Sequence, residues 1–229
     1  MTDDKRMERT ELLIGPDGIR KLQNSFVAVA GLGGVGGHCT EALARAGIGR
    51  LHLIDADVVQ PSNLNRQLIA TKETVGMLKT VAMEQRLRLV SDCEVTRSEI
   101  FLTSETVEEA FAGLEPDFIV DAIDSVQGKL AIAVYARSHG IPVISCLGAG
   151  NRLDATAFYI TDIFRTAGDP LARKFRSELR KAGIDELPVV ISREQAKREP
   201  GQTVIGSIAP VPAAEGLAAA SYVIRNLLK

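Results

Sequence analysis

A glycine-rich segment gives the first indication of chemistry in this sequence. Residues 25–30 are apolar and of strand length, and segment 31–36, with sequence GLGGVG, follows directly and opens a helix. Backbone N–H groups in such a turn can approach a phosphate at the helix N-terminus. The segment therefore indicates a nucleotide site, which NAD and ATP fit equally. Its glycines are Gly31, Gly33, Gly34 and Gly36.

An acidic residue follows at the distance expected for ribose binding. Asp55 ends a second apolar segment, residues 51–55, about twenty residues beyond the glycine turn. A carboxylate at this point of a dinucleotide-binding fold accepts hydrogen bonds from ribose hydroxyl groups. Asp55 is thus the expected ribose ligand for either nucleotide.

Two cationic side chains indicate which of the two nucleotides, NAD or ATP, the site binds. Arg66 ends a polar, asparagine-rich turn, and Lys79 follows on a predicted helix. A dinucleotide pyrophosphate needs mainly helix-terminal N–H groups, whereas attack on the α-phosphate of ATP requires neutralisation of a triphosphate and its pyrophosphate leaving group. Either cation alone could be a solvated surface charge, but together and beside the glycine turn they favour ATP.

Two aspartates accompany a third apolar segment, residues 118–121. Ligands of open α/β sheets bind at the carboxyl ends of the strands, and there Asp124 can reach a Mg²⁺ ion that bridges phosphates. Asp121 is explained equally well as a strand-end residue that caps the next helix. We therefore expect ATP with Mg²⁺, and Asp124 as the metal ligand.

The periodicity of apolar residues predicts the elements that position these side chains. Strands are expected at 25–30, 51–55, 118–121 and 143–146, with helices around 41–44, at 80–90 and at 129–139. Strands that alternate with helices indicate an α/β fold with a Rossmann-like, doubly wound and mainly parallel sheet. Beyond residue 150, the expected elements are strands at 157–161 and 189–192 and helices at 170–182 and 213–228, which form a C-terminal antiparallel extension.

These elements predict a single main domain. We expect an N-terminal arm over 1–24, an ATP-binding Rossmann-like domain over 25–150, and an extension over 151–229 that completes the same domain on the substrate side.

Composition excludes several classes of protein. The 229 residues carry 27 Lys and Arg against 29 Asp and Glu, a net charge of −2, so any basic surface for a nucleic acid must be local. Since no stretch reaches the ~18 apolar residues of a membrane span, we expect a cytoplasmic protein without membrane contact. The three cysteines form no C-x-x-C pair, which argues against a disulfide framework or structural zinc and favours buried apolar roles.

Taken together, these motifs resemble the ThiF/MoeB superfamily, relatives of the ubiquitin-activating enzymes. The resemblance implies ATP binding, adenylation of a carboxylate with release of pyrophosphate, and a homodimer in which an N-terminal arginine reaches the partner's active site. Arg9 matches that arginine and joins Arg66, Lys79 and Asp124 as the expected catalytic residues. The further nucleotide-binding residues that it implies are Asp57, Asn63, Gln67 and Ser125.

Other segments resemble one branch of this superfamily, the tRNA threonylcarbamoyladenosine dehydratases. The segments are 121–125, 148–150, 162–166, 169–172 and 206–208. The branch implies adenylation of the threonyl carboxylate of N6-threonylcarbamoyladenosine at position 37 of tRNA, followed by attack from within the same side chain that closes a ring and expels AMP. An internal nucleophile needs no enzyme cysteine, in agreement with the absence of any cysteine after Cys146. The implied partners are this tRNA and a sulfur-transfer protein.

The tRNA is expected to contact a basic helix. Residues 165–181 carry six cations against two carboxylates, and Leu171, Phe175, Leu179 and Ala182 are expected to pack the opposite face. A solvated amphipathic helix would explain the same pattern. The six cations are Arg165, Arg173, Lys174, Arg176, Arg180 and Lys181.

Two further functions remain open at this point. One is an adenylating enzyme for a ubiquitin-like sulfur-carrier protein, which would require a Gly-Gly-ended protein in place of tRNA. The other is a non-catalytic nucleotide- or NAD-binding Rossmann module, which would not exchange pyrophosphate with ATP.

Overall fold

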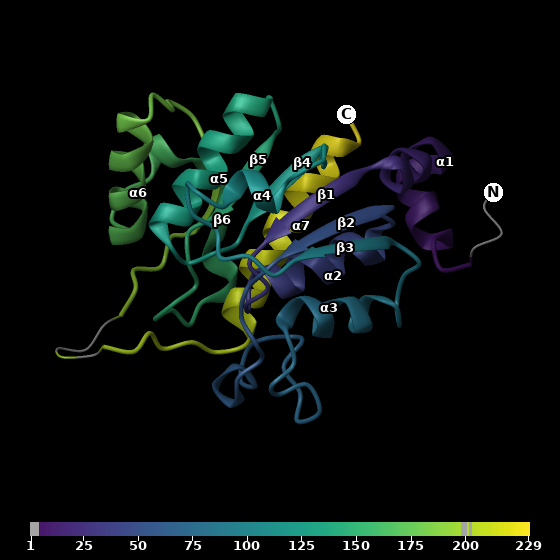
Figure 1. Ribbon diagram of the computed structural model, residues 1–229, viewed down its shortest axis with the longest axis horizontal. Helices are drawn as coiled ribbons and strands as arrows, with labels where there is room; N and C mark the ends of the chain where they lie inside the picture. Colours follow the sequence, from purple (N-terminus) through teal and green to yellow (C-terminus); the bar gives the residue numbers. More distant parts are fainter. Residues whose placement is uncertain (1–4, 198–200, 202) are drawn as a thin grey trace.

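The protein is a three-layer α/β structure with helices on both faces of a single sheet (Figure 1). The computed structural model describes residues 5–197, 201 and 203–229. One face is covered by α1, α2, α3 and α7, and the other by α4, α5 and α6. The helices are α1 (Glu8–Asn24), α2 (Gly36–Ala46), α3 (Lys79–Leu87), α4 (Val107–Ala110), α5 (Val126–His139), α6 (Pro170–Lys181) and α7 (Pro210–Leu227).

The sheet has seven strands in the order β3-β2-β1-β4-β5-β7-β6. All neighbouring strands are parallel except β6, which is antiparallel to β7. The strand order reverses direction between β1 and β4, which makes this the switch point where α/β sheets bind ligands. The strands are β1 (Phe26–Ala30), β2 (Arg50–Ile54), β3 (Glu94–Ser98), β4 (Phe118–Asp121), β5 (Val143–Cys146), β6 (Phe158–Asp162) and β7 (Pro188–Ser192).

The predicted fold class is confirmed, and besides short 3₁₀ helices the structure adds two α-helices and one strand that we did not predict. They are α1, β3 and α4. The β3 strand lies at the edge of the sheet and is half-exposed, so its sequence EVTRS lacks the apolar run of a central strand. In α1, Pro16 follows Gly15, whose φ of 72° kinks the helix and removes the clash that proline causes inside a regular helix.

A buried ion pair joins the centre of the sheet to α5. Lys129 Nζ lies 3.2 Å from both carboxylate oxygens of Asp121 and donates to the backbone oxygen of Cys146 at 2.7 Å. Both side chains are almost inaccessible to water. Asp121 is therefore a structural residue; it balances the charge of Lys129 at the end of β4.

The burial of the cysteines agrees with the expectation from the sequence for two of the three. Cys39 and Cys146 are buried, whereas Cys93 is only half-buried, so the expectation of three buried cysteines was wrong for Cys93. No helix within the described ranges is long and apolar enough to cross a membrane.

The buried pair leads to a stability prediction. Lys129→Met should lower the free energy of unfolding by about 3–5 kcal/mol, because it leaves Asp121 charged and without a counter-charge inside the protein. Arg137→Met, on the same helix, should cost less than about 1 kcal/mol, since Arg137 pairs with Asp185 at the surface. Urea unfolding measures both, and equal losses would contradict this account of the pair.

Candidate functional site

A cavity of about 870 Å³ opens at the carboxyl ends of β1, β2, β4 and β5. It brings together the predicted nucleotide-binding residues from five separate segments of the chain. Gly36 is the one predicted glycine that does not line the cavity. The predicted residues that do line it are Gly31, Gly33, Gly34, Asp55, Asp57, Asn63, Arg66, Gln67, Lys79, Asp124 and Ser125.

The glycine turn is constrained by its surroundings. Gly31 has a φ of 88°, and a Cβ atom there would lie 2.7 Å from the carbonyl oxygen of Ala122. At Gly36 a Cβ atom would lie 1.7 Å from the carbonyl oxygen of Gly31, so no larger residue fits. Gly36 therefore has a packing role: it lets the first turn of α2 close onto the end of β1.

Asp55 connects the glycine turn to the cationic side of the cavity. Its carboxylate accepts the N–H groups of Leu32 at 2.7 Å and of Asp57 at 2.9 Å. Lys79 Nζ lies 3.6 Å from Asp55 and 2.7 Å from the more exposed Asp57. Burial raises the pKa of the Asp55 carboxyl, against the opposing effect of Lys79 and the two N–H groups.

Backbone pairing brings Lys79 to this position. Asp57 accepts the N–H of Lys79 at 3.0 Å, and Val59 exchanges hydrogen bonds with Met77 and Gly76. The segments that follow β2 and precede α3 thus form a short antiparallel pair, which a sequence analysis based on apolar runs does not detect.

The turn that carries Arg66 begins with a short 3₁₀ helix, Pro61–Asn63. Asn63 accepts the N–H of Gln60 through its side chain, and the N–H groups of Arg66 and Gln67 through its backbone oxygen. Arg66 donates to the backbone oxygen of Ser62 at 2.9 Å, and its half-buried guanidinium lines the cavity. Gln67 Oε1 is buried without a hydrogen-bond partner, so it is available to a ligand.

Asp124 and Ser125 lie between β4 and α5. The Ser125 hydroxyl accepts the N–H of Gly128 at 3.4 Å and caps α5, while Asp124 is exposed to the cavity. Among the described residues, no three His, Cys, Asp or Glu side chains gather into a metal site. Mg²⁺ does not need such a cluster, because it binds one or two carboxylates together with substrate phosphates. Asp124 fits that requirement.

Two buried ionisable residues beside the cavity, Arg152 and Glu215, were not predicted from the sequence. Arg152 pairs with Asp169 at 2.6 Å and donates to the backbone oxygen of Gly148 at 2.8 Å. Glu215, on α7, accepts the N–H of Gly148 at 3.1 Å. One signal in the sequence could have indicated Glu215: it is the single carboxylate in the alanine-rich segment that forms α7.

Cys146 lines the cavity but is unsuited to attack as a thiolate. Burial raises the pKa of its thiol well above the usual value, and the neighbouring Glu215 adds to this effect. Because the thiolate is the nucleophilic form, the geometry provides no activated cysteine here.

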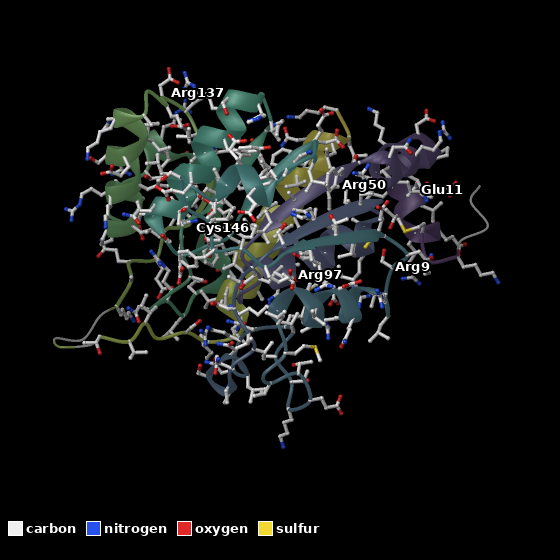
Figure 2. All side chains as sticks on the ribbon, in the orientation of Figure 1. Arg9, Glu11, Arg50, Arg97, Arg137 and Cys146 are labelled. Carbon is white, nitrogen blue, oxygen red and sulfur yellow. The ribbon has the colours of Figure 1, made fainter. Side chains whose placement is uncertain are left out.

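The remaining predicted residues lie outside the cavity. Arg9 is exposed on α1, which adjoins the beginning of β1, and Figure 2 shows it far from Cys146. Basic α6 lies at the opposite end of the long axis from α1 (Figure 1). Its buried face contains Phe175 and Leu179, as predicted, whereas Ala182 ends the helix and is exposed, contrary to prediction.

The basic residues of this region differ in their contacts. Arg173 and Lys174 are exposed, and so is Arg180, whose guanidinium lies 5.3 Å from the centre of the Phe164 ring. Arg176 is half-buried and donates to Thr166. Lys181 pairs with Glu178, and Arg165 ends the 3₁₀ helix Ile163–Arg165 that precedes α6.

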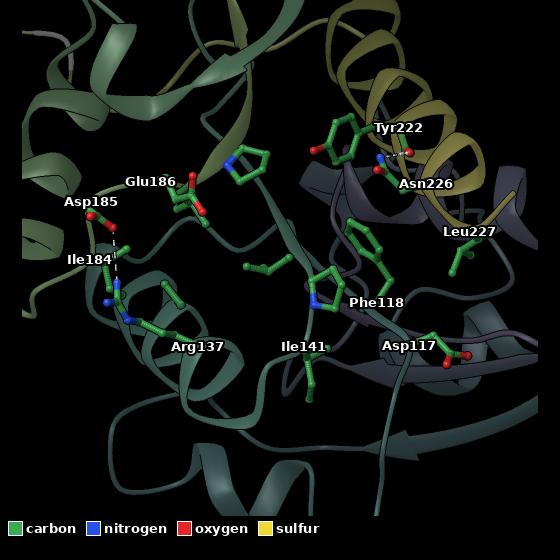
Figure 3. Close-up of a pocket in the computed structure, with 15 residues that line it drawn as sticks. Asp117, Phe118, Arg137, Ile141, Ile184, Asp185, Glu186, Tyr222, Asn226 and Leu227 are labelled. Carbon is green, nitrogen blue, oxygen red and sulfur yellow. Dashed lines mark hydrogen bonds and ion pairs between the residues drawn. The ribbon is translucent and has the colours of Figure 1, made fainter. Parts of the chain in front are cut away.

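A second cavity, of about 590 Å³, lies at the amino ends of β4, β5 and β7 (Figure 3). Its walls are formed by aromatic and aliphatic side chains such as Phe118 and Tyr222, with an acidic margin that includes Asp185 and Glu186. It contains no glycine turn and none of the predicted site residues. The candidate site is therefore the cavity at the carboxyl ends.

Two relatives that share one name match most of this chain. The tRNA threonylcarbamoyladenosine dehydratase of Bacillus subtilis is 41% identical over 244 residues, which cover 98% of this chain and 95% of the relative. The enzyme of the same name from Escherichia coli is 38% identical over 177 residues, or 77% of this chain and 66% of the relative.

A solved structure is similar along nearly the whole chain. The crystal structure of the E. coli dehydratase TcdA in complex with ATP superimposes with a TM-score of 0.91 at 34% identity. The match covers 98% of this chain and 94% of that one. The profile of the ThiF family spans residues 7–229. The chain therefore belongs to the ThiF family.

Proposed function

We propose that this protein is an ATP-dependent tRNA threonylcarbamoyladenosine dehydratase. The observation that carries the proposal is the cavity, in which a glycine turn, a ribose-side carboxylate, two cations and Asp124 converge on one nucleotide-sized space. Relatives of that name match the chain, and TcdA has been solved with ATP and with AMP. We also propose a cytoplasmic location, because it fits a tRNA substrate.

The reaction has two steps. A carboxylate oxygen of the threonyl group attacks the α-phosphorus of ATP, which forms an acyl adenylate and breaks the bond to pyrophosphate. A nucleophilic atom of the same side chain then attacks the acyl carbon, loses its proton and expels AMP. The substrate loses one oxygen and two hydrogens, the elements of water, and that oxygen leaves on AMP.

The protein contributes charge and position. Lys79 and Arg66 stabilise the negative charge that develops on the transferred and leaving phosphates, where a dry, preorganised cation is most effective. Asp124 would hold a Mg²⁺ ion, which supplies further charge neutralisation at the phosphates. Asp55 would receive the ribose hydroxyl groups. No side chain needs to act as a nucleophile.

The assay of choice incubates the protein with ATP, Mg²⁺ and tRNA that contains threonylcarbamoyladenosine, followed by mass analysis of the nucleosides. Loss of one water from the modified nucleoside, with AMP formed in equal amount, is the expected result. Activity that instead requires a Gly-Gly-ended carrier protein would replace this proposal with the sulfur-carrier function. A sulfur-transfer protein partner is tested separately by co-purification.

Charge removal should reduce catalysis. Arg66→Ala, Lys79→Ala and Asp124→Ala should each lower turnover about 10²-fold or more, because each side chain acts mainly on the transition state. Lys72→Ala, an exposed loop lysine, is the matched control and should retain activity. Since Lys79 also balances Asp55, the free energy of unfolding is measured beside turnover. A stable variant with wild-type turnover at saturating ATP would remove that residue from the site.

Arg9 should act across a two-fold dimer. It lies near the amino end of β1, whereas the glycine turn follows the carboxyl end, so a partner subunit is needed to bring it to the site. Arg9→Ala and Lys79→Ala chains, each inactive alone, should recover up to about a quarter of wild-type activity when random exchange restores one site per mixed dimer. Proven subunit exchange without recovery would place Arg9 outside the partner's site.

The exposed cations of α6 should bind tRNA phosphates. The combined change Arg173→Gln, Lys174→Gln and Arg180→Gln should weaken tRNA binding and reduce the salt slope by up to about three, without altering ATP affinity. Arg176→Gln is tested separately because its contact with Thr166 gives it a structural role. Arg225→Gln, exposed on α7, is the control. An unchanged salt slope in the triple variant would exclude α6 as the tRNA contact.

A further inference from the structure

The Gly148–Gly150 wall is the part of the cavity that follows β5, made of Gly148, Ala149 and Gly150. Gly148 has a φ of 87°, a conformation that its own sequence does not enforce, because glycine adopts many others. Its geometry must therefore be fixed by contacts from neighbouring elements.

Two buried ionisable side chains supply those contacts, one from α7 and one from the segment that follows the wall. From α7, Glu215 Oε1 accepts the N–H of Gly148 at 3.1 Å. From beyond the wall, Arg152 Nη1 donates to the backbone oxygens of Gly148 at 2.8 Å and Gly150 at 3.2 Å. These hydrogen bonds all join the backbone of the wall to side chains that water does not reach freely, since Glu215 is 0% and Arg152 6% exposed.

The position of the wall indicates which substrate it faces. The strand order β2-β1-β4-β5 places Asp55 at one end of the cavity and the wall at the other, with the glycine turn and Asp124 between them. If the ribose lies at Asp55, the phosphates lie in the middle, and the space beside the wall is left for the carboxylate that attacks them. Leu171, in the first turn of α6, lines this same side.

Arg152 also connects the wall to α6. Its second terminal nitrogen pairs with Asp169 at 2.6 Å, and Asp169 caps α6 by accepting the N–H of Ala172 at 2.8 Å. The wall and the beginning of the basic helix are thus held by one side chain.

We propose that Glu215 and Arg152 are positioning residues that hold the Gly148–Gly150 wall for the carboxylate-bearing substrate. They act through the backbone of the wall and do not contact the reacting atoms. The assignment to the carboxylate side rests on the proposed function, whereas the fixing of the wall does not.

The ionisation of the Glu215 carboxyl allows its role to be tested by experiment. Its Oε2 atom has no hydrogen-bond partner, and burial raises the pKa of its carboxyl to about 7 despite the attraction of Lys129 and Arg152. The charged groups around it, Lys129 with Asp121 and Arg152 with Asp169, already balance in pairs. Burial therefore keeps this carboxyl protonated up to a higher pH than that of an exposed glutamate.

The raised pKa of Glu215 determines how the stability of the protein depends on pH. The folded protein binds this proton more tightly than the unfolded chain, so its stability should fall as the pH rises from about 4.5 to about 7 and then level off. Glu215→Gln keeps an oxygen that can accept from Gly148 but carries no titratable proton. Its advantage in Tm over the wild type should therefore be larger at pH 8 than at pH 5.

Hydrogen exchange tests the fixing of the wall directly. Glu215→Ala should speed amide exchange in peptides that span 147–152 about tenfold, while peptides of β1 stay unchanged. Glu215→Gln and the exposed α7 control Ser221→Ala should remain within about twofold of the wild type. Wild-type exchange at 147–152 in Glu215→Ala, or an equal increase in every peptide, would overturn the proposal.

Kinetic measurements test whether the wall faces the carboxylate-bearing substrate or ATP. Glu215→Ala should raise KM for the modified tRNA about tenfold and leave the Kd for ATP within about twofold, and Arg152→Met should do the same. The double variant should be less impaired than the two single effects combined, since both act through one wall. Equal weakening of ATP and tRNA would overturn the assignment to the carboxylate side. If the wild type does not act on tRNA, the proposed function fails, and exchange still decides on the wall.

Discussion

The hydrogen bonds of Asp55 are the interaction on which the site depends. One carboxylate oxygen fixes the N–H of Leu32 in the glycine turn and the other fixes Asp57, while Lys79 approaches from the beginning of α3. The glycine turn, the segment after β2 and the beginning of α3 are thereby held to one point. These contacts offset only part of the cost of burying this carboxylate, because burial still raises its pKa.

The parts of the fold that depend on short-range patterns could be predicted from the sequence. Buried parallel strands such as β1 and β4 have continuous apolar runs, and the glycine turn between β1 and α2 is dictated by close backbone approach at Gly31 and Gly36. The carboxyl ends of the parallel strands β1, β2 and β4 lie at one edge of the sheet. The sequence therefore already indicated that Asp55, after β2, and Asp124, after β4, line one cavity.

Other parts could not be predicted because their cause is tertiary. The β3 strand is polar because it lies at an edge. In α1, two helical segments meet at the kink of Gly15, and only the second segment buries side chains, Ile19 and Leu22. Arg152 and Glu215 carry no motif; their partners include the Asp169 carboxylate and the N–H of Gly148, the latter 67 residues from Glu215, which only the folded chain brings near. Arg9 lies outside the cavity, so the role that we propose for it requires a second subunit.

The placement of α7 also has a consequence for the order of folding. Pro212 of α7 lines the cavity beside Gly34, and Gly216 packs on the backbone of Val35, so a helix distant in sequence closes the glycine turn. Contacts of such long sequence separation carry a large loop-closure entropy and form late in folding. The β1–α2 unit should therefore acquire nucleotide affinity only when α7 docks on α2, and not when its own strand and helix first form.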